Sequence, residues 1–189
     1  MGRMLPDVGL GYPARAMAAR TPVRCWLMKC EPSAYTIDDL ERDGTTSWEG
    51  VRNFQARNFM RDEMKVGDPV LFYASNAEPS GVTGLARIAR EGYPDAFATK
   101  KGHKYYDEGS TADAPTWYMV DIAFVENFRG TVPLETLKAT KGLEKMVVTQ
   151  KGSRLSVQPV TPAEYEIVVK LARAGAAVAP KVVAGRKKR

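Results

Sequence analysis

The sequence predicts an α+β fold in which a small mixed sheet or β-barrel of about five to six strands is flanked by short helices. Three observations predict it. Short segments rich in β-branched and aromatic residues recur along the chain. Short turns or single helices separate these segments. They do not alternate regularly with long helices, which disfavours a doubly wound parallel sheet.

Five strands are predicted from apolar runs and from the turns that bound them. The first is short, apolar and followed by Pro32, which is typical of a buried strand. The second and third are joined by a turn with Pro79 and Gly81, so we expect a hairpin. Pro159 cannot donate a ladder hydrogen bond, so the last segment is a strand or a strand edge. In chain order, the segments are 25–29, 69–75, 81–91, 116–128 and 154–160.

Four short helices are predicted from signals at their ends. The first has Thr36 as N-cap, two Asp in its first turn and Gly44 past its end. A capping box at Thr161 opens the last helix, and a short helix is expected at 133–139. The second of the four helices in chain order begins at Asn53. Its helical spacing places four apolar residues on one face: Ala56, Phe59, Met60 and Met64.

The net charge of +6 is concentrated at the two ends of the chain. Residues 1–24 carry +3 and residues 173–189 carry +6, which leaves residues 25–172 at −3. The basic character therefore does not predict a basic DNA-binding body. We expect a disordered N-terminal extension at 1–24, one domain at 25–172, and a basic tail that can attract phosphates.

Composition argues against several other classes of protein. No apolar run approaches the roughly 18 residues of a membrane span, so no membrane partner is predicted. Cys25 and Cys30 would point to opposite faces of a strand, which disfavours a disulfide, and reduced cysteines predict an intracellular protein. We predict a cytoplasmic monomer. With His103 as the one histidine, a zinc ligand set is lacking, and no metal or cofactor is predicted.

The sequence contains no recognisable catalytic constellation. There is no GxxxxGK[ST] loop and no GxSxG elbow. His103 lies in a polar loop without the partners of a triad, and the pair Asp38 and Asp39 is explained by a helix first turn. Cys30 beside Lys29 could be a nucleophile or a packing residue at a strand end. The sequence therefore predicts a protein that is not an enzyme.

Four segments mix aromatic or apolar side chains with polar groups, a combination that suits a nucleic-acid base. Rings stack on bases at about 1–3 kcal/mol per base, and polar groups read the edge of a flipped-out base. Trp48 lies in a turn at a helix start, where a core position is harder to assign. The four segments are 26–32, 47–54, 71–76 and 154–159.

Nine motifs follow one another between Trp26 and Ala172: WLMKCEP, YTIDDL, WEGVRNFQARNFMR, MKVGDPVLFYASN, GLARI, YPD, KYYD, WYMVDIAFV and RLSVQPVTPAEY. In this order they resemble the EVE domain of the PUA-like superfamily. The resemblance implies a PUA-like β-barrel flanked by helices and a pocket that recognises modified bases in nucleic acid. It also implies a structural relationship to YTH-type methyladenosine readers.

Transferred position by position, the resemblance implies a base pocket. Trp48 and Tyr73 are expected to supply ring surface. Asn53, Ser75 and Asn76 are expected to read the base edge. The full pocket comprises Lys29, Cys30, Trp48, Arg52, Asn53, Tyr73, Ser75, Asn76, Arg154 and Ser156.

Three arginines, Arg52, Arg57 and Arg154, are expected to face phosphates together with the basic tail. The chain departs from the family pattern at two positions. Cys30 stands where family members commonly have Ser, and Ala74 stands where they have His. A thiol is a weaker donor than a hydroxyl, so these changes bear on which base is preferred.

The sequence thus predicts a non-catalytic module that binds DNA or RNA carrying a modified base. Methylated or hydroxymethylated cytosine and methyladenine are the expected bases. Two alternatives stay open. One is an RNA-modifying or nucleic-acid-cleaving enzyme on a related barrel, and the other is a small-molecule or nucleotide sensor.

Overall fold

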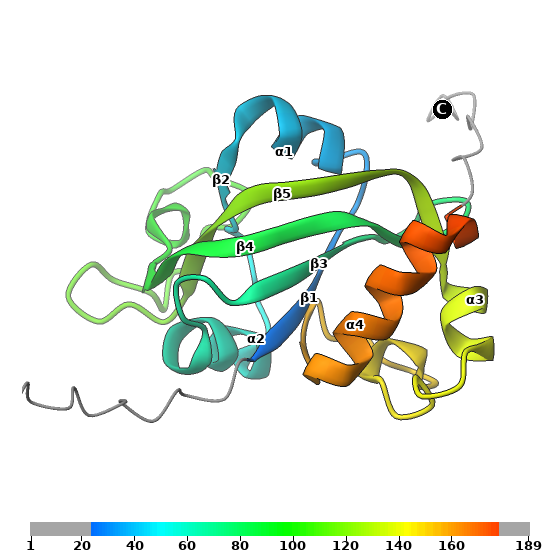
Figure 1. Cartoon of the computed structure of the whole chain (residues 1–189). Helices are drawn as coiled ribbons and strands as arrows, with labels where there is room; N and C mark the ends of the chain where they lie inside the picture. The colour runs from blue at the N-terminus through cyan, green and yellow to red at the C-terminus, as the bar shows by residue number, and fades with distance from the viewer. Residues whose placement is uncertain (1–23, 178–189) are drawn as a thin grey trace, which may run out of the picture.

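A computed structural model describes residues 24–177 of the chain, and it is built on one six-stranded mixed sheet (Figure 1). The strands are β1 (Cys25–Cys30), β2 (Thr45–Ser47), β3 (Pro69–Ala74), β4 (Gly81–Pro94), β5 (Tyr118–Pro133) and β6 (Val157–Val160). The α-helices are α1 (Ile37–Asp43), α2 (Phe54–Asn58), α3 (Leu134–Ala139) and α4 (Pro162–Leu171). The predicted α+β class is confirmed.

The strand order is β2-β5-β4-β3-β1-β6, and β1 and β3 form the parallel pair. The sheet is open in the described residues, because β2 and β6 stand at opposite edges and do not pair. The expected β-barrel is therefore an open sheet within residues 24–177. Both edge strands are short, and Pro159 in β6 has no N–H to extend the ladder.

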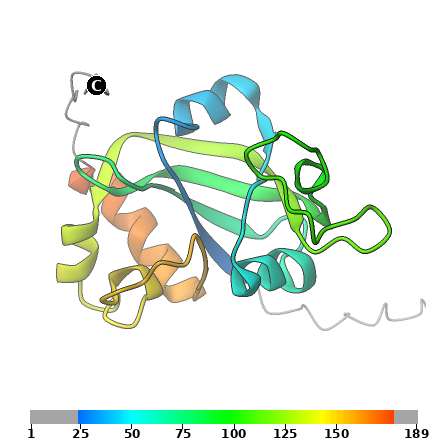
Figure 2. The ribbon, with the colours of Figure 1, turned by 180° about the vertical axis from the view of Figure 1, so that it is seen from behind.

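The alternation of side chains along the strands divides the core into two layers, one on each face of the sheet. Trp26 and Met28 point to the first face, where α1 and α2 pack. Cys25 and Leu27 point to the second face, where α3 and α4 pack. Figure 1 shows α4 crossing in front of the sheet, and Figure 2 shows the same arrangement from behind.

Most predicted elements are present, with shifted ends. The β3–β4 hairpin is confirmed, as are the caps at Thr36 and Thr161. The second helix is shorter than expected as an α-helix, because it continues as a π-helical turn at Phe59–Glu63. Strand β2 escaped prediction because three residues carry too little periodicity.

Within residues 24–177, no helix is long and apolar enough to cross a membrane. The expectations of an N-terminal extension and of a basic tail fall almost wholly on residues 1–23 and 178–189, outside the described residues.

Candidate binding site

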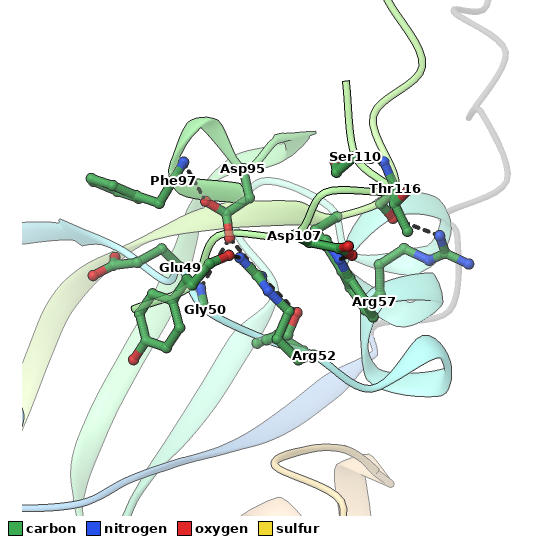
Figure 3. Close-up of polar contacts among 12 residues, drawn as sticks. Glu49, Gly50, Arg52, Arg57, Asp95, Phe97, Asp107, Ser110 and Thr116 are labelled. Atoms are coloured by element: carbon green, nitrogen blue, oxygen red, sulfur yellow. Dashed lines mark hydrogen bonds and ion pairs between the residues drawn. The ribbon is translucent and has the colours of Figure 1, made fainter. Parts of the chain in front are cut away.

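A buried carboxylate organises the segment that leads into α2 (Figure 3). The Asp95 side chain is fully buried, and its Oδ2 accepts from the backbone N–H of Gly50 at 3.1 Å and from Arg52 Nη1 at 2.9 Å. Its Oδ1 accepts from the Phe97 N–H at 2.9 Å. Arg52 also donates to the Tyr105 carbonyl. These bonds tie Gly50 and Arg52 to the long loop between β4 and β5.

Gly50 is needed at its position for two reasons. Its φ of +78° lies in the left-handed region, and a Cβ there would sit 2.3 Å from Tyr105 Cζ. The Tyr105 ring therefore closes against the backbone. Lys104 Nζ lies 4.5 Å from the centre of the same ring, and a hydrogen bond with the Tyr105 side chain raises the pKa of Lys104, with smaller contributions from Glu49 and Cys30.

Asn53 is the N-cap of α2. Its Oδ1 accepts from the N–H groups of Gln55 at 3.0 Å and Ala56 at 3.1 Å, which fixes the side-chain amide in one orientation. Its Nδ2 donates to no group in the described part of the chain, and the residue is exposed. Asn53 therefore presents two oriented donors to solvent.

Trp48 belongs to the core layer on the first face of the sheet. It is 8% exposed and packs edge-on against Phe72, with ring centroids 5.6 Å apart. Among residues 24–177, only Gln158 Oε1 is a buried side-chain polar atom without a partner. The Trp48 indole N–H, which also has no partner there, is thus open to solvent. The side chain is a core residue with an accessible donor.

A stack of rings and guanidinium groups flanks the start of α2. Phe54 is 59% exposed and stacks on Trp117, with centroids 5.0 Å apart and planes 28° apart. Arg57 lies 5.0 Å from the Phe54 ring centre and donates to the Thr116 carbonyl at 2.6 Å. Arg52 lies 5.2 Å from the Trp117 ring centre. The two arginines are thereby held in place by internal contacts.

Lys29 and Tyr73 lie on the second face of the sheet, away from Trp48. Tyr73 is 3% exposed in the core beside α4, and burial raises its pKa to about 12. Lys29 Nζ lies 5.7 Å from the Tyr73 ring centre and donates to the Ser153 carbonyl at 3.4 Å. Burial lowers the pKa of Lys29. Cys30 instead packs against the first core layer.

Ser75 and Asn76 follow β3 at another edge of the molecule. The Ser75 N–H donates to the Cys30 carbonyl at 2.8 Å, and Asn76 Nδ2 donates to Glu31 at 2.7 Å. Asn76 lines a cleft of about 870 Å³ between α1 and the β3–β4 turn. Three carboxylates and one guanidinium lie in its wall, a charge balance that disfavours phosphates: Glu31, Asp38, Glu78 and Arg129.

The segment before β6 holds the last two predicted residues. The Ser156 carbonyl accepts from the Lys29 N–H at 2.8 Å, so this segment extends the pairing of β1. Arg154 is exposed, and its guanidinium contacts no partner within residues 24–177. Leu155 between them packs against the core layer that contains Trp48.

The model of one family, described as the EVE domain, matches residues 24–171. The chain belongs to the EVE domain family. Human thymocyte nuclear protein 1 is 41% identical over 164 residues, which cover 77% of this chain and 72% of that protein.

Two solved structures extend this finding. A Pseudomonas putida protein is 46% identical with a TM-score of 0.75, over 78% of this chain and 98% of that chain. Human THYN1 protein, solved in complex with DNA containing 5-methylcytosine, is 40% identical with a TM-score of 0.73, over 79% of this chain and 97% of that chain. These structural similarities show that the chain has the EVE fold.

In this EVE domain the structure brings part of the predicted site together. Trp48, Arg52 and Asn53 share the approach to α2, and Cys30 packs on the same face of the sheet. One expected role is contradicted. Tyr73 supplies no ring surface beside Trp48, because adjacent strand residues face opposite sides of a sheet. Arg52 is paired with the buried Asp95 and stays 25% exposed, so its expected role towards phosphates stays a prediction.

Sequence reasoning missed four residues of this region. Asp95 and Tyr105 lie within the motifs YPD and KYYD, which gave no hint of contact with Gly50. Phe54 and Trp117 lie 63 positions apart, and neither carries a local signal for the other. The loop between β4 and β5 thus contributes as much to the region as α2 does.

The structure gives no support to the catalytic alternatives. Burial raises the pKa of the Cys30 thiol, and its side chain faces away from Lys29, so the thiolate is not favoured. His103 stacks on Phe97 at 4.7 Å, and its Nδ1 accepts from the Tyr105 N–H at 3.3 Å. Within residues 24–177, no group of three or more His, Cys, Asp or Glu side chains could hold a metal ion.

Proposed function

We propose that this EVE domain is a non-catalytic module that binds nucleic acid and recognises a modified base. The base is methylated or hydroxymethylated cytosine, or methyladenine, in DNA or RNA. Membership of the EVE family and the solved complex of human THYN1 with 5-methylcytosine DNA support the proposal. The arrangement at the start of α2 supports it independently.

The oriented amide of Asn53 carries the proposal. Its oxygen is held by two backbone N–H groups of α2, so its nitrogen offers two donors without an ordering cost on binding. The Trp48 N–H adds a third accessible donor on the same approach to α2. Ring nitrogens and carbonyl oxygens on the edges of bases accept such donors.

Other groups complete the proposed interface. Cys30 borders the base, where its thiol offers only a weak donor. Arg154 and Lys104 are exposed and face phosphates, together with the basic residues 181–189. Arg52 positions the loop through Asp95, and its expected role towards phosphates stays part of the proposal.

The decisive experiment uses Asn53→Ser. Serine is an equally good N-cap, so the helix is retained while the amide donors are removed. We expect the wild type to bind one modified oligonucleotide more tightly than its unmodified counterpart in a fluorescence titration. The preference should disappear in Asn53→Ser, and thermal stability should stay within about 0.5 kcal/mol.

Asn58→Ser is the matched control, because Asn58 is exposed on the same helix and makes no cap hydrogen bond. It should leave the preference unchanged. Equal affinity of the wild type for modified and unmodified oligonucleotides, across all three modifications, would refute the proposal. Turnover of an oligonucleotide that is lost in Cys30→Ala or Asp38→Asn would instead favour the enzymatic alternative.

We also propose that the protein is cytoplasmic and monomeric. The relative from Homo sapiens carries the name of a nuclear protein. Fractionation of cells and sedimentation of the purified chain test the two statements separately.

A further inference from the structure

The cleft between α1 and the β3–β4 turn offers a second binding surface, apart from the start of α2. Its volume is about 870 Å³, which lies within the range of ligand pockets in proteins. Three buried apolar side chains line it, from α1 and from β3: Ile37, Phe72 and Ala74. The cleft therefore suits an occupant that brings apolar side chains of its own.

The charge of the cleft selects a cationic occupant. Within residues 24–177, the exposed carboxylates of Glu31 and Glu78 form no ion pair. The guanidinium of Arg129 is engaged elsewhere, since its Nη2 lies 2.6 Å from Glu41 Oε1. The negative charge of the wall is thus left largely without partners, and it attracts cations.

The chain itself contains a segment of matching chemistry. We call residues 181–189 the basic segment. It combines two adjacent valines, Val182 and Val183, with five cations: Lys181, Arg186, Lys187, Lys188 and Arg189. The valines match the apolar lining of the cleft, and the cations match its carboxylates. Residues 178–189 follow the last described residue, and at up to about 3.3 Å per residue these twelve can span about 40 Å.

The described part of the chain ends close to the cleft. Arg173, in the π-helical turn η4 (Ala172–Ala176), pairs with Glu126 of β5 at 2.6 Å. The next residue of β5, Asn127, lines the cleft from the opposite face of the sheet. Figures 1 and 2 both show the end of the last helix beside the β3–β4 turn, which forms one wall of the cleft. The segment has to pass one end of the sheet, and packed layers lie about 10 Å apart, so its length suffices.

We infer that the basic segment docks in this cleft of its own domain when no nucleic acid is bound, and that phosphates compete with the cleft for it. The docking stands on the cleft, its charge and the end of the described chain. The competition rests on the proposed function, in which the same residues face phosphates. Affinity for unmodified nucleic acid depends mainly on phosphate contacts, so the cleft lowers it.

Nuclear magnetic resonance of the full chain tests the docking. In the segment variant, Arg186, Lys187, Lys188 and Arg189 are all replaced by Gln. We expect the backbone amide signals of Asn76, Gly130 and Thr131, which line the cleft, to shift relative to the wild type. High salt should reproduce the shift in the wild type, because it screens exposed charges.

The cleft variant, Glu31→Gln with Glu78→Gln, completes a double-mutant cycle. In this background the segment substitutions should shift the cleft signals clearly less. The matched control is Glu144→Gln with Glu166→Gln, which removes two exposed carboxylates outside the cleft. In the control background the segment substitutions should shift the signals as they do in the wild type.

A fluorescence titration with an unmodified oligonucleotide tests the competition. The cleft variant should bind it roughly threefold more tightly than the control variant does, because two ion pairs no longer hold the segment. When the segment substitutions are added to both variants, this difference should disappear. The comparison with the control variant removes the general effect of two lost negative charges.

Unshifted cleft signals in the segment variant would overturn the docking, and so would a shift that the cleft variant retains in full. A shift that disappears on dilution would assign the occupant to a second copy of the chain and overturn docking within one molecule. Equal affinities of the cleft and control variants would overturn the competition. A wild type without preference for a modified base would instead refute the proposed function and leave the docking intact.

Discussion

Asp95→Asn should destabilise the domain more than any exposed charge substitution. The Asp95 side chain is fully buried and accepts three hydrogen bonds, one of them from Arg52. Asparagine has a similar shape, but its Nδ2 would face an N–H group or the Arg52 guanidinium, both of which are donors. The substitution also leaves Arg52 without its counter-charge.

Removal of one partner of a buried ion pair costs about 3–5 kcal/mol. The Arg52 side chain is 25% exposed, so water partly compensates, and we expect about 3 kcal/mol, at the lower end of that range. For a domain of this size such a loss lowers the melting temperature by roughly 6–12 °C. Circular dichroism during heating and urea titration measure it.

The matched control is Glu91→Gln. Glu91 pairs with Lys65 at 2.9 Å, but 47% of its side chain is exposed, so the melting temperature should not change measurably. If Asp95→Asn melted within about 1 °C of the wild type, the buried network would contribute little, and the reasoning would be refuted.

Three further predictions concern other parts of the fold. Gly50→Ala should lower the free energy of unfolding by about 1–2 kcal/mol through backbone strain, and by more because its Cβ displaces the Tyr105 ring. Gly102→Ala, at φ +82° with open space around it, should show only the loss from backbone strain. Equal losses for the two variants in chemical denaturation would contradict the ring contact. Trp48→Ala should lose about 3–5 kcal/mol because it leaves a cavity against Phe72, and a stable variant would show that the side chain is not part of the core. Burial raises the pKa of Cys25 from 9.0 to about 11, so the folded state retains a proton that the unfolded state loses, and stability should fall as pH rises from 9 towards 11. Urea titrations at pH 8 and 10.5 should show a smaller decrease for Cys25→Ala, and equal decreases would contradict the assignment.

The elements were predictable where the local signal is strong. The caps at Thr36 and Thr161 and the β3–β4 hairpin follow from residues within a few positions of one another. The sequence could also predict that Lys29 and Cys30 point to opposite faces of the sheet, since neighbouring strand residues face opposite sides. The same rule applied to Tyr73 would have placed it away from the face of Phe72.

The rest depends on contacts between distant segments. Nothing near Asp95 in the sequence indicates that its carboxylate lies beneath Gly50, and the polar loop between β4 and β5 has no periodicity. The ion pair of Arg52 with Asp95 was not predictable for the same reason, because an exposed and a paired arginine look alike in sequence. Asn53 was placed correctly because a helix start is a local feature.

The pairing of β1 has a consequence for how this chain acquires its structure. Cys25 at the start of the domain pairs with Val160 near its end, and β1 also pairs in parallel with β3. Such non-local pairing gives the domain a high contact order, which slows folding. During synthesis, β1 cannot complete its pairing until β6, at Val157–Val160, has left the ribosome.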